Sequence, residues 1–199
     1  MQVKKEHIQN AILKAATEEF LQYGFQKSSM RRMAEHAGTR MSNFYNYFKN
    51  KDELFNFIVK EQYQLLQDTL RPIVQSDKSF NFRNISNIKI LSEELLQWIQ
   101  SFTPLFTIET ILLTDCSKGT IYEHVKDDLI QDIVIIINKI CCKIPERLSK
   151  NKYPLELFVR QLLDDIAAIV KQQYKEPYIK DIICNRICTF VAGVFIISY

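Results

Sequence analysis

The chain has 199 residues, of which 47% are hydrophobic and 25% charged, and its formal net charge is +3. This length can bury the core of one or two domains, whereas four glycines and no alternating strand pattern leave little basis for a β-sheet. Charge is unevenly divided, because residues 1–51 hold nine Lys or Arg and four Asp or Glu, and residues 52–199 hold seventeen and nineteen.

An apolar stripe predicts the first helix, from Glu6 to Tyr23. Its residues recur at i, i+3, i+4, i+7, i+8 and i+12, as expected for one buried helix face. They are Ile8, Ala11, Ile12, Ala15, Ala16 and Phe20. Gly24 then ends the helix.

Residues 28–48 indicate two short helices joined by a tight turn. The first begins at Ser28 or Ser29, whose hydroxyls can cap free backbone N–H groups. One face carries Met30, Met33, Ala34 and Ala37. Arg31 and Arg32 would point away from that core, and Gly38 would form the turn.

The second short helix, from Met41 to Phe48, is expected to be anchored by Phe44 and Phe48 at i and i+4. The polar residues Ser42, Asn43, Tyr45 and Asn46 fall on the sides away from those rings. Outward amide and hydroxyl groups can bond base edges, and Tyr and Lys groups suit phosphate oxygens. The alternative is that the aromatic residues are only core and the lysines a solvated rim. We prefer this alternative only for Phe44 and Phe48, which we expect to be buried.

The start of the next helix indicates an anion site. Asn50 can cap it, with Glu53 as its reciprocal partner three residues on. Lys51 and the free N–H groups of the first turn would then attract a phosphate. The basic part of the chain coincides with this region, which raises the encounter rate with DNA but gives no choice of sequence. Chance asymmetry of charge is the alternative.

Many positions at fixed spacing resemble the N-terminal domain of the TetR (tetracycline repressor-like) family of bacterial transcription regulators. They are Ile8, Ala15, Ala16, Phe20, Gly24, Phe25, Ser28, Ser29, Met30, Met33, Ala34, Ala37, Gly38, Tyr45, Tyr47, Phe48, Lys51, Leu54 and Phe55. The likeness covers about the first quarter of the chain. It implies a homodimer with a three-helix DNA-binding head and an all-helical body that binds an inducer and dimerises.

The resemblance assigns phosphate contacts to Ser28, Tyr45, Tyr47 and Lys51, and base reading to the outward residues between Arg40 and Asn46. The expected DNA interface is Ser28, Ser29, Arg40, Met41, Ser42, Asn43, Tyr45, Asn46, Tyr47, Lys49 and Lys51. Three residues depart from the family's pattern. Arg40 replaces a small capping residue, so Thr39 or Ser42 would cap instead. Ser42 and Asn43 stand where many members have glycine and threonine. Met41 either touches a thymine methyl or folds back on Phe44.

The remaining chain indicates only helices. A long helix from Lys51 to Arg71 would join head to body, and residues 72–87 are the best candidate for a loop. Breaks are expected at Pro72, Pro104, Gly119, Pro145, Pro154 and Pro177. We therefore expect a DNA-binding domain at residues 5–65 and an effector-binding and dimerisation domain at residues 66–199.

The last two helices, at about 154–174 and 178–198, are expected to form a dimer interface. Apolar residues surround the final helix on all sides, so a partner chain is its natural cover. The alternatives are an intrachain core and a membrane span. The apolar run after Arg186 is shorter than the ~20 residues that a bilayer needs, so we expect no membrane contact.

The middle helices, about residues 87–149, are expected to hold a small-molecule effector. Aromatic side chains would form the walls of an apolar cavity, and a few polar groups would orient the ligand. The expected contacts are Trp98, Phe102, Phe106, Glu109 and Tyr122. Ordinary core packing is the alternative for each aromatic residue.

No constellation in the sequence supports catalysis, a cofactor or a metal ion. The five cysteines form no CxxC pair, and the three histidines lack metal-ligand spacing. Cys184 and Cys188 share a helix face and Cys141 adjoins Cys142, but buried small hydrophobes explain them more simply than a metal or redox sensor. No secretory segment is visible, so a reduced cytoplasm is expected.

These patterns predict an all-α, homodimeric, cytoplasmic DNA-binding regulator that is not an enzyme. The expected mechanism is repression at an inverted-repeat operator, relieved by a small-molecule inducer. One alternative is a helical protein that binds a ligand or partner and has lost operator binding, which Arg40 and Met41 favour. A helical enzyme is the other alternative. The sequence names neither the operator nor the inducer.

Overall fold

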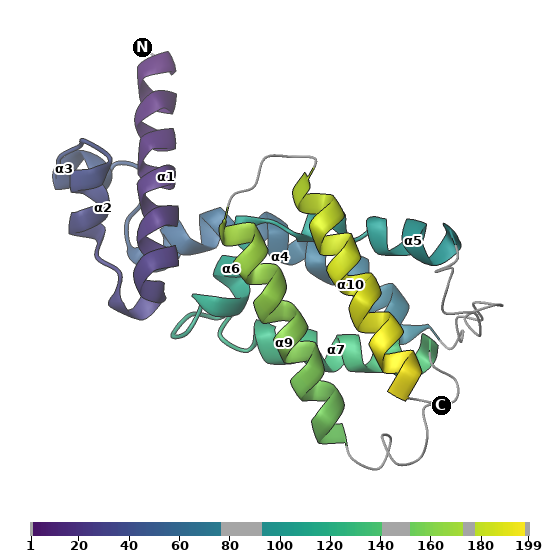
Figure 1. The fold of residues 1–199 in the computed structure, drawn as a ribbon. Coiled ribbons are helices and arrows are strands. Elements are labelled where there is room, and N and C mark those ends of the chain that lie inside the picture. The colour runs from purple at the N-terminus through teal and green to yellow at the C-terminus, as the bar shows by residue number, and fades with distance from the viewer. Residues whose placement is uncertain (1, 77–92, 141–151, 173–177, 198–199) are drawn as a thin grey trace. The chain divides into compact units, whose positions relative to one another are not determined.

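The computed structural model describes residues 2–76, 93–140, 152–172 and 178–197, and these residues contain helices and turns but no strand (Figure 1). The predicted all-α class is confirmed. The helices are α1 (Gln2–Lys27), α2 (Met30–His36), α3 (Met41–Phe44), α4 (Lys51–Gln75), α5 (Glu93–Gln100), the 3₁₀ helix η1 (Thr103–Leu105), α6 (Ile108–Asp115), α7 (Val125–Ile140), α9 (Lys152–Lys171) and α10 (Tyr178–Ile197).

The chain divides into two compact units. The first contains Met1–Leu65 and Glu109–Lys126, and the second contains Leu66–Ile108 and Asp127–Tyr199. Helix α4 contributes residues to both. The segment Glu109–Lys126 lies in the part of the chain that the sequence assigns to the body, yet it packs with the N-terminal residues.

The core of the first unit is built from the apolar face of α1. Three aromatic rings meet there, with Phe20 and Phe55 edge-to-face at 5.0 Å and Phe25 and Phe55 at 5.4 Å. The buried residues of the predicted stripe are Ile12, Ala15, Ala16 and Phe20. Gly24 interrupts α1 with φ 69° and ψ 168°, so the predicted break is at the right residue, although one more helical turn follows it.

The predicted break at Pro72 is wrong, because α4 continues through it to Gln75. A proline in a helix removes the hydrogen bond of its own missing N–H and strains the preceding turn. Here Pro72 lies in the last turn, so few bonds depend on it, and the Ser76 N–H still donates to the Pro72 carbonyl at 3.1 Å. The Lys139 ammonium group donates to the carbonyls of Ile73, Val74 and Ser76 and satisfies the end of the helix.

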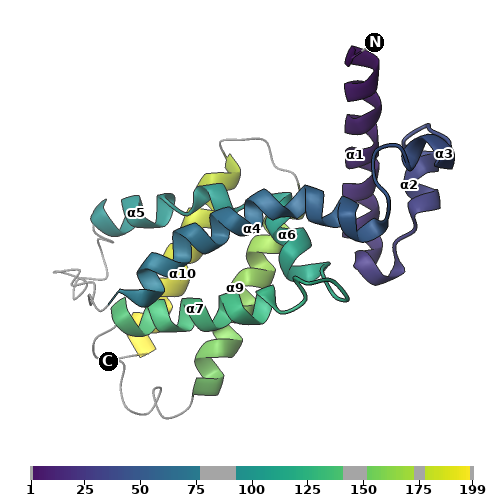
Figure 2. The ribbon, with the colours of Figure 1, turned by 180° about the vertical axis from the view of Figure 1, so that it is seen from behind.

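In the second unit α10 packs against α9 and α5 (Figure 2). Helix α9 begins at Lys152, two residues before the predicted start, and its predicted end at Tyr174 lies outside the described residues. Buried Ile99 of α5 contacts buried Cys184 and Cys188, and burial raises the pKa of both thiols. Such thiols are poor nucleophiles and metal ligands. Cys141 and Cys142 lie outside the described residues.

The described residues bear on two remaining alternatives, a membrane span and a metal site. None of the helices they form is long and apolar enough to cross a membrane. Nor do they bring together three or more His, Cys, Asp or Glu side chains that could hold a metal ion.

Candidate nucleic-acid interface

Helices α2 and α3 form a helix-turn-helix beside α1 (Figure 1). Met33 and Ala34 of α2 and Phe44 of α3 are at most 1% exposed, so each helix contributes its small apolar face to the core of the first unit. The turn between them needs Gly38, whose φ of 65° is unfavourable for other residues. The Thr39 N–H closes the turn by donating to the Ala34 carbonyl at 3.0 Å.

The serines before α2 do not cap it with their hydroxyls, contrary to expectation. Ser29 is the N-cap residue, but its side chain makes no capping hydrogen bond. The Ser28 hydroxyl instead donates to the Phe25 carbonyl at 2.6 Å, at the end of α1, and the residue is buried. Because that side chain faces α1, its expected phosphate contact stays a prediction without support from the geometry.

Helix α3 has only four residues, whereas the sequence predicts a helix to Phe48. After Phe44 the chain continues in tight turns, in which the Tyr47 N–H donates to the Phe44 carbonyl three residues before it. Arg40 is the N-cap and makes no side-chain capping bond, so capping by Thr39 or Ser42 is wrong. The Thr39 hydroxyl accepts a hydrogen bond from the Asn43 side-chain amide at 2.9 Å instead.

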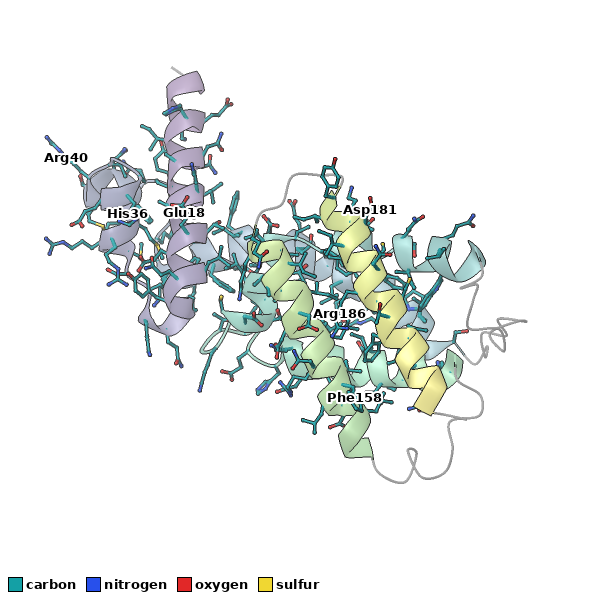
Figure 3. The ribbon with its side chains drawn as sticks, in the orientation of Figure 1. Glu18, His36, Arg40, Phe158, Asp181 and Arg186 are labelled. Atoms are coloured by element: carbon teal, nitrogen blue, oxygen red, sulfur yellow. The ribbon has the colours of Figure 1, made fainter. Side chains whose placement is uncertain are left out.

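Most of the expected base and phosphate contacts lie on the outside of this reading unit, residues 28–48, or directly after it. The exposed ones are Arg40, Ser42, Tyr45, Asn46 and Lys49, and the half-buried ones are Ser29, Met41, Asn43, Tyr47 and Lys51. Figure 3 shows the Arg40 side chain extending outward from the start of α3. The Asn46 amide lies 3.4 Å from the Asn43 side-chain oxygen, which places two base-reading candidates side by side.

Lys51 is held by the end of α1. Its ammonium nitrogen lies 2.6 Å from the Phe25 carbonyl, 3.1 Å from that of Ser28 and 3.4 Å from that of Gln26. It also lies 4.5 Å from the centre of the Phe25 ring. An ammonium group has three N–H donors, so these carbonyls occupy its donor capacity. Burial lowers the pKa of Lys51, and the charges of Asp52 and Glu19 partly oppose that shift.

One of the two hydrogen bonds predicted for the capping pair at the start of α4 is confirmed. The Glu53 N–H donates to the Asn50 side-chain oxygen at 2.7 Å, as predicted. The Glu53 carboxylate accepts from the Lys49 N–H at 2.8 Å, one residue before the predicted partner. This carboxylate therefore fixes the chain between α3 and α4.

The sequence patterns do not predict an ion pair that the first unit contains, between the buried carboxylate of Glu19 and the partly exposed guanidinium group of Arg32. Glu19 of α1 is 2% exposed and accepts hydrogen bonds from the Ser29 N–H at 2.8 Å and from Arg32 Nε at 2.8 Å. Arg32 therefore turns back toward α1 rather than away from it. The hydrogen bond to Glu19 raises the pKa of Arg32. The sequence does contain a signal, because Glu19 follows Ile12 by seven residues and Ala15 by four, on the apolar face.

The expected effector contacts fall in both units. Trp98, Phe102 and Phe106 belong to the second unit, where the Trp98 and Phe102 rings meet edge-to-face at 4.7 Å. Glu109 and Tyr122 belong to the first. Tyr122 is 6% exposed, and its hydroxyl donates to the side-chain oxygen of Asn56 on α4.

The sequence of the reading unit matches a known family. Residues 12–58 match the family of bacterial regulatory proteins described as the tetR family. The chain is also 37% identical over 65 residues to the uncharacterized HTH-type transcriptional regulator YhgD of Bacillus subtilis (strain 168). That alignment covers 31% of this chain and 34% of the relative, so the shared part spans about a third of each. Residues 12–58 thus resemble the DNA-binding part of the tetR family of bacterial regulatory proteins, as the residue pattern predicts.

Proposed function

We propose that this protein is a transcriptional regulator that binds double-stranded DNA through its reading unit. The observation that carries this proposal is the exposed polar surface of α3 and of the turn after it, mounted on α1 by buried Met33, Ala34 and Phe44. A short helix held from behind in this way can enter a major groove with its polar side chains toward the bases.

The contacts divide into base readers and phosphate ligands. Base reading falls to Arg40, Met41, Ser42, Asn43 and Asn46. Phosphate binding falls to Ser29, Tyr45, Tyr47 and Lys49, which flank them. Ser28 and Lys51 support the interface from beneath in this proposal, because their polar atoms bind carbonyls at the end of α1.

The protein acts as a homodimer in this proposal, through α9 and α10. Both helices expose large apolar side chains: Leu157 is 54% exposed, Phe158 49%, Tyr178 68% and Ile182 38%. Figure 3 shows Phe158 on α9 and Asp181 on α10 in the two adjacent helices. A second copy of the same surface would cover these residues by a twofold axis. Two heads then meet successive major grooves ~34–36 Å apart, so the operator is an inverted repeat.

A small molecule that binds the body regulates DNA binding in this proposal. Trp98, Phe102 and Phe106 supply its aromatic contacts. Because α4 carries residues of both units, its displacement would change the separation of the two heads. A ligand drives such a change only by binding the non-DNA conformation better, and a coupling of ~1–3 kcal/mol lowers operator affinity roughly 5–150-fold. Loss of the operator complex relieves repression.

Selection of bound sites from random DNA tests the proposal most directly. The purified full chain should enrich an inverted repeat, and its affinity for that repeat should fall steeply as salt rises. Tyr47→Phe should weaken binding to all sequences alike, because a phosphate contact carries no sequence information. Enrichment of no sequence, together with no salt-dependent binding, would refute the proposal.

A second candidate function rests on the short α3 helix. Its N-cap residue, Arg40, makes no side-chain capping bond, and the helix has only four residues. Both features favour a helical ligand- or partner-binding protein that no longer reads an operator. Failure of the selection experiment by a folded, dimeric protein would support this second candidate.

A further inference from the structure

Glu19 directs its hydrogen bonds to the start of α2. One carboxylate oxygen, Oε1, accepts from the Ser29 N–H and from two nitrogens of Arg32. The other oxygen, Oε2, is buried and has no hydrogen-bond partner among the described residues. The Ser29 hydroxyl makes no capping bond, so the carboxylate of α1 satisfies an N–H group at the first turn of α2.

Arg32 ties the same carboxylate to the end of α1. Its guanidinium group donates to the Lys27 carbonyl at 2.9 Å and stacks over the Tyr23 ring, 4.5 Å from the ring centre. These contacts and the pair with Glu19 hold the planar group on three sides. The guanidinium group of arginine holds its N–H donors in fixed directions, which suits this geometry. A lysine at this position would reproduce the charge but not the contacts.

Few side chains of α2 and α3 are buried in the core of the first unit. Within α2 and α3, the buried side chains are those of Met33, Ala34 and Phe44. Apolar burial is not directional, whereas hydrogen bonds restrict angle as well as distance. A recognition surface has to be held to within ~0.5 Å and ~10–20° to bind its target. The ion pair supplies directional contacts at the base of α2.

We infer that Glu19 and Arg32 are positioning residues for DNA recognition: they set the orientation of α2, and with it α3, on α1. Arg32 acts through Glu19 and is not a phosphate ligand, although its side chain is 42% exposed. The inference rests on the proposed DNA-binding function. It assigns a role to two residues outside the outward surface of the reading unit.

Glu19→Gln distinguishes a charge effect from a positioning role, because the two predict opposite changes in operator affinity. This substitution keeps the shape and one acceptor oxygen but removes a negative charge from the head. By charge alone, binding to a polyanion should strengthen. If Glu19 positions α2, affinity for the selected operator should instead fall about 10-fold, whereas affinity for random DNA stays the same or rises. A purely structural role would lower both affinities together, so the ratio is the informative measurement.

Arg32 and its neighbour Arg31 provide matched variants. Arg31 pairs at 3.1 Å with Glu35, and both side chains are exposed, at 83% and 61%. Arg31→Gln and Arg32→Gln remove the same charge from the same helix, and we expect only the second to lower the ratio of operator to random-DNA affinity. Arg32→Lys should resemble Arg32→Gln and leave the salt slope unchanged. Retained operator binding in Arg32→Lys would indicate a phosphate ligand and refute the inference.

Amide hydrogen exchange on the free, full-length protein separates this inference from the proposed function. In Glu19→Gln the Ser29 amide and the rest of α2 should exchange faster, with exchange in α4 unchanged. If the wild-type protein bound no DNA, the proposed function would fail, and this measurement would still test the contact. Unchanged exchange at Ser29, or operator binding by Glu19→Gln at least as tight as wild type, would overturn the positioning role.

Discussion

Replacing Lys51 by methionine separates two roles for this lysine. Methionine keeps an unbranched side chain but removes the ammonium group and its contacts with three carbonyls at the end of α1. As a support of the head, Lys51 contributes to the stability of the free protein. As a phosphate ligand, it contributes only to the DNA complex.

The contacts of Lys51 give the size of the expected effect. A hydrogen bond to a charged group contributes about 1.5–3 kcal/mol, and a cation near a helix C-terminus about 0.3–1 kcal/mol. Desolvation of the ammonium group, which lowers its pKa, and screening by solvent at this half-buried position both offset part of this sum, and we expect a loss of about 2 kcal/mol in the free energy of unfolding. For a chain of this length that loss corresponds to about 4–8 °C in the melting temperature.

Lys49→Met is the matched control, because this exposed lysine lies two residues away and carries the same charge. We expect it to leave the melting temperature unchanged at equal protein concentration. Its loss of a phosphate contact should lower the salt slope of DNA binding by about 0.9 per head, hence about 1.8 for a dimer. Lys51→Met should instead lower the melting temperature and leave the salt slope of DNA binding unchanged. An unchanged melting temperature with a lowered salt slope in Lys51→Met would refute the supporting role.

Three further predictions concern base reading, the dimer and pH. Asn46→Ala should relax sequence choice at one operator position, at a cost of ~1–3 kcal/mol, and an unchanged selected sequence would contradict base reading. Phe158→Asp should give monomers in sedimentation, whereas Ile135→Asp, at an exposed apolar position of α7, should leave the dimer intact; equal effects would exclude α9 from the interface. Burial raises the pKa of Asp165, but hydrogen bonds led by that from Arg186 outweigh it, so the pKa is lowered overall. Asp165→Asn should therefore be less stable than wild type at pH 7, by about 1 kcal/mol, and this difference should shrink as the pH falls through the lowered pKa, which urea unfolding at pH 7 and at successively lower pH measures.

Local signals predicted the backbone of the head well. Gly24 and Gly38 both adopt positive φ, as expected for the end of a helix and for a tight turn. Asn50 caps α4 at the predicted residue. Such features depend on a few adjacent residues, so the sequence contains the information needed to recognise them. The length of α3 was overestimated, because the i and i+4 spacing of its phenylalanines is also compatible with a short helix followed by tight turns.

The features that the sequence patterns do not predict are contacts between residues far apart along the chain. The carbonyls that bind Lys51 lie 23–26 residues before it, and Glu19 lies 13 residues before Arg32. Helical periodicity assigns a residue to the buried face but does not identify the partner of a buried charge. Lys51 lies beside the expected DNA-binding helix in the sequence, which therefore predicts a phosphate ligand. The sequence pattern does not show that the side chain reaches α1 instead, because this depends on how α4 is packed.

The position of residues 109–126 affects how a ligand signal would reach the reading unit. Inside the first unit, the Phe25 N–H donates to the Cys116 carbonyl at 2.8 Å, and the Tyr122 hydroxyl donates to Asn56 of α4. A displacement of α6 would therefore act on the end of α1, whose carbonyls bind Lys51, and on the first half of α4. The reading unit connects these two helices along the chain. Because Tyr122 is buried against α4, this arrangement favours a role in transmitting such a displacement over direct contact with a ligand.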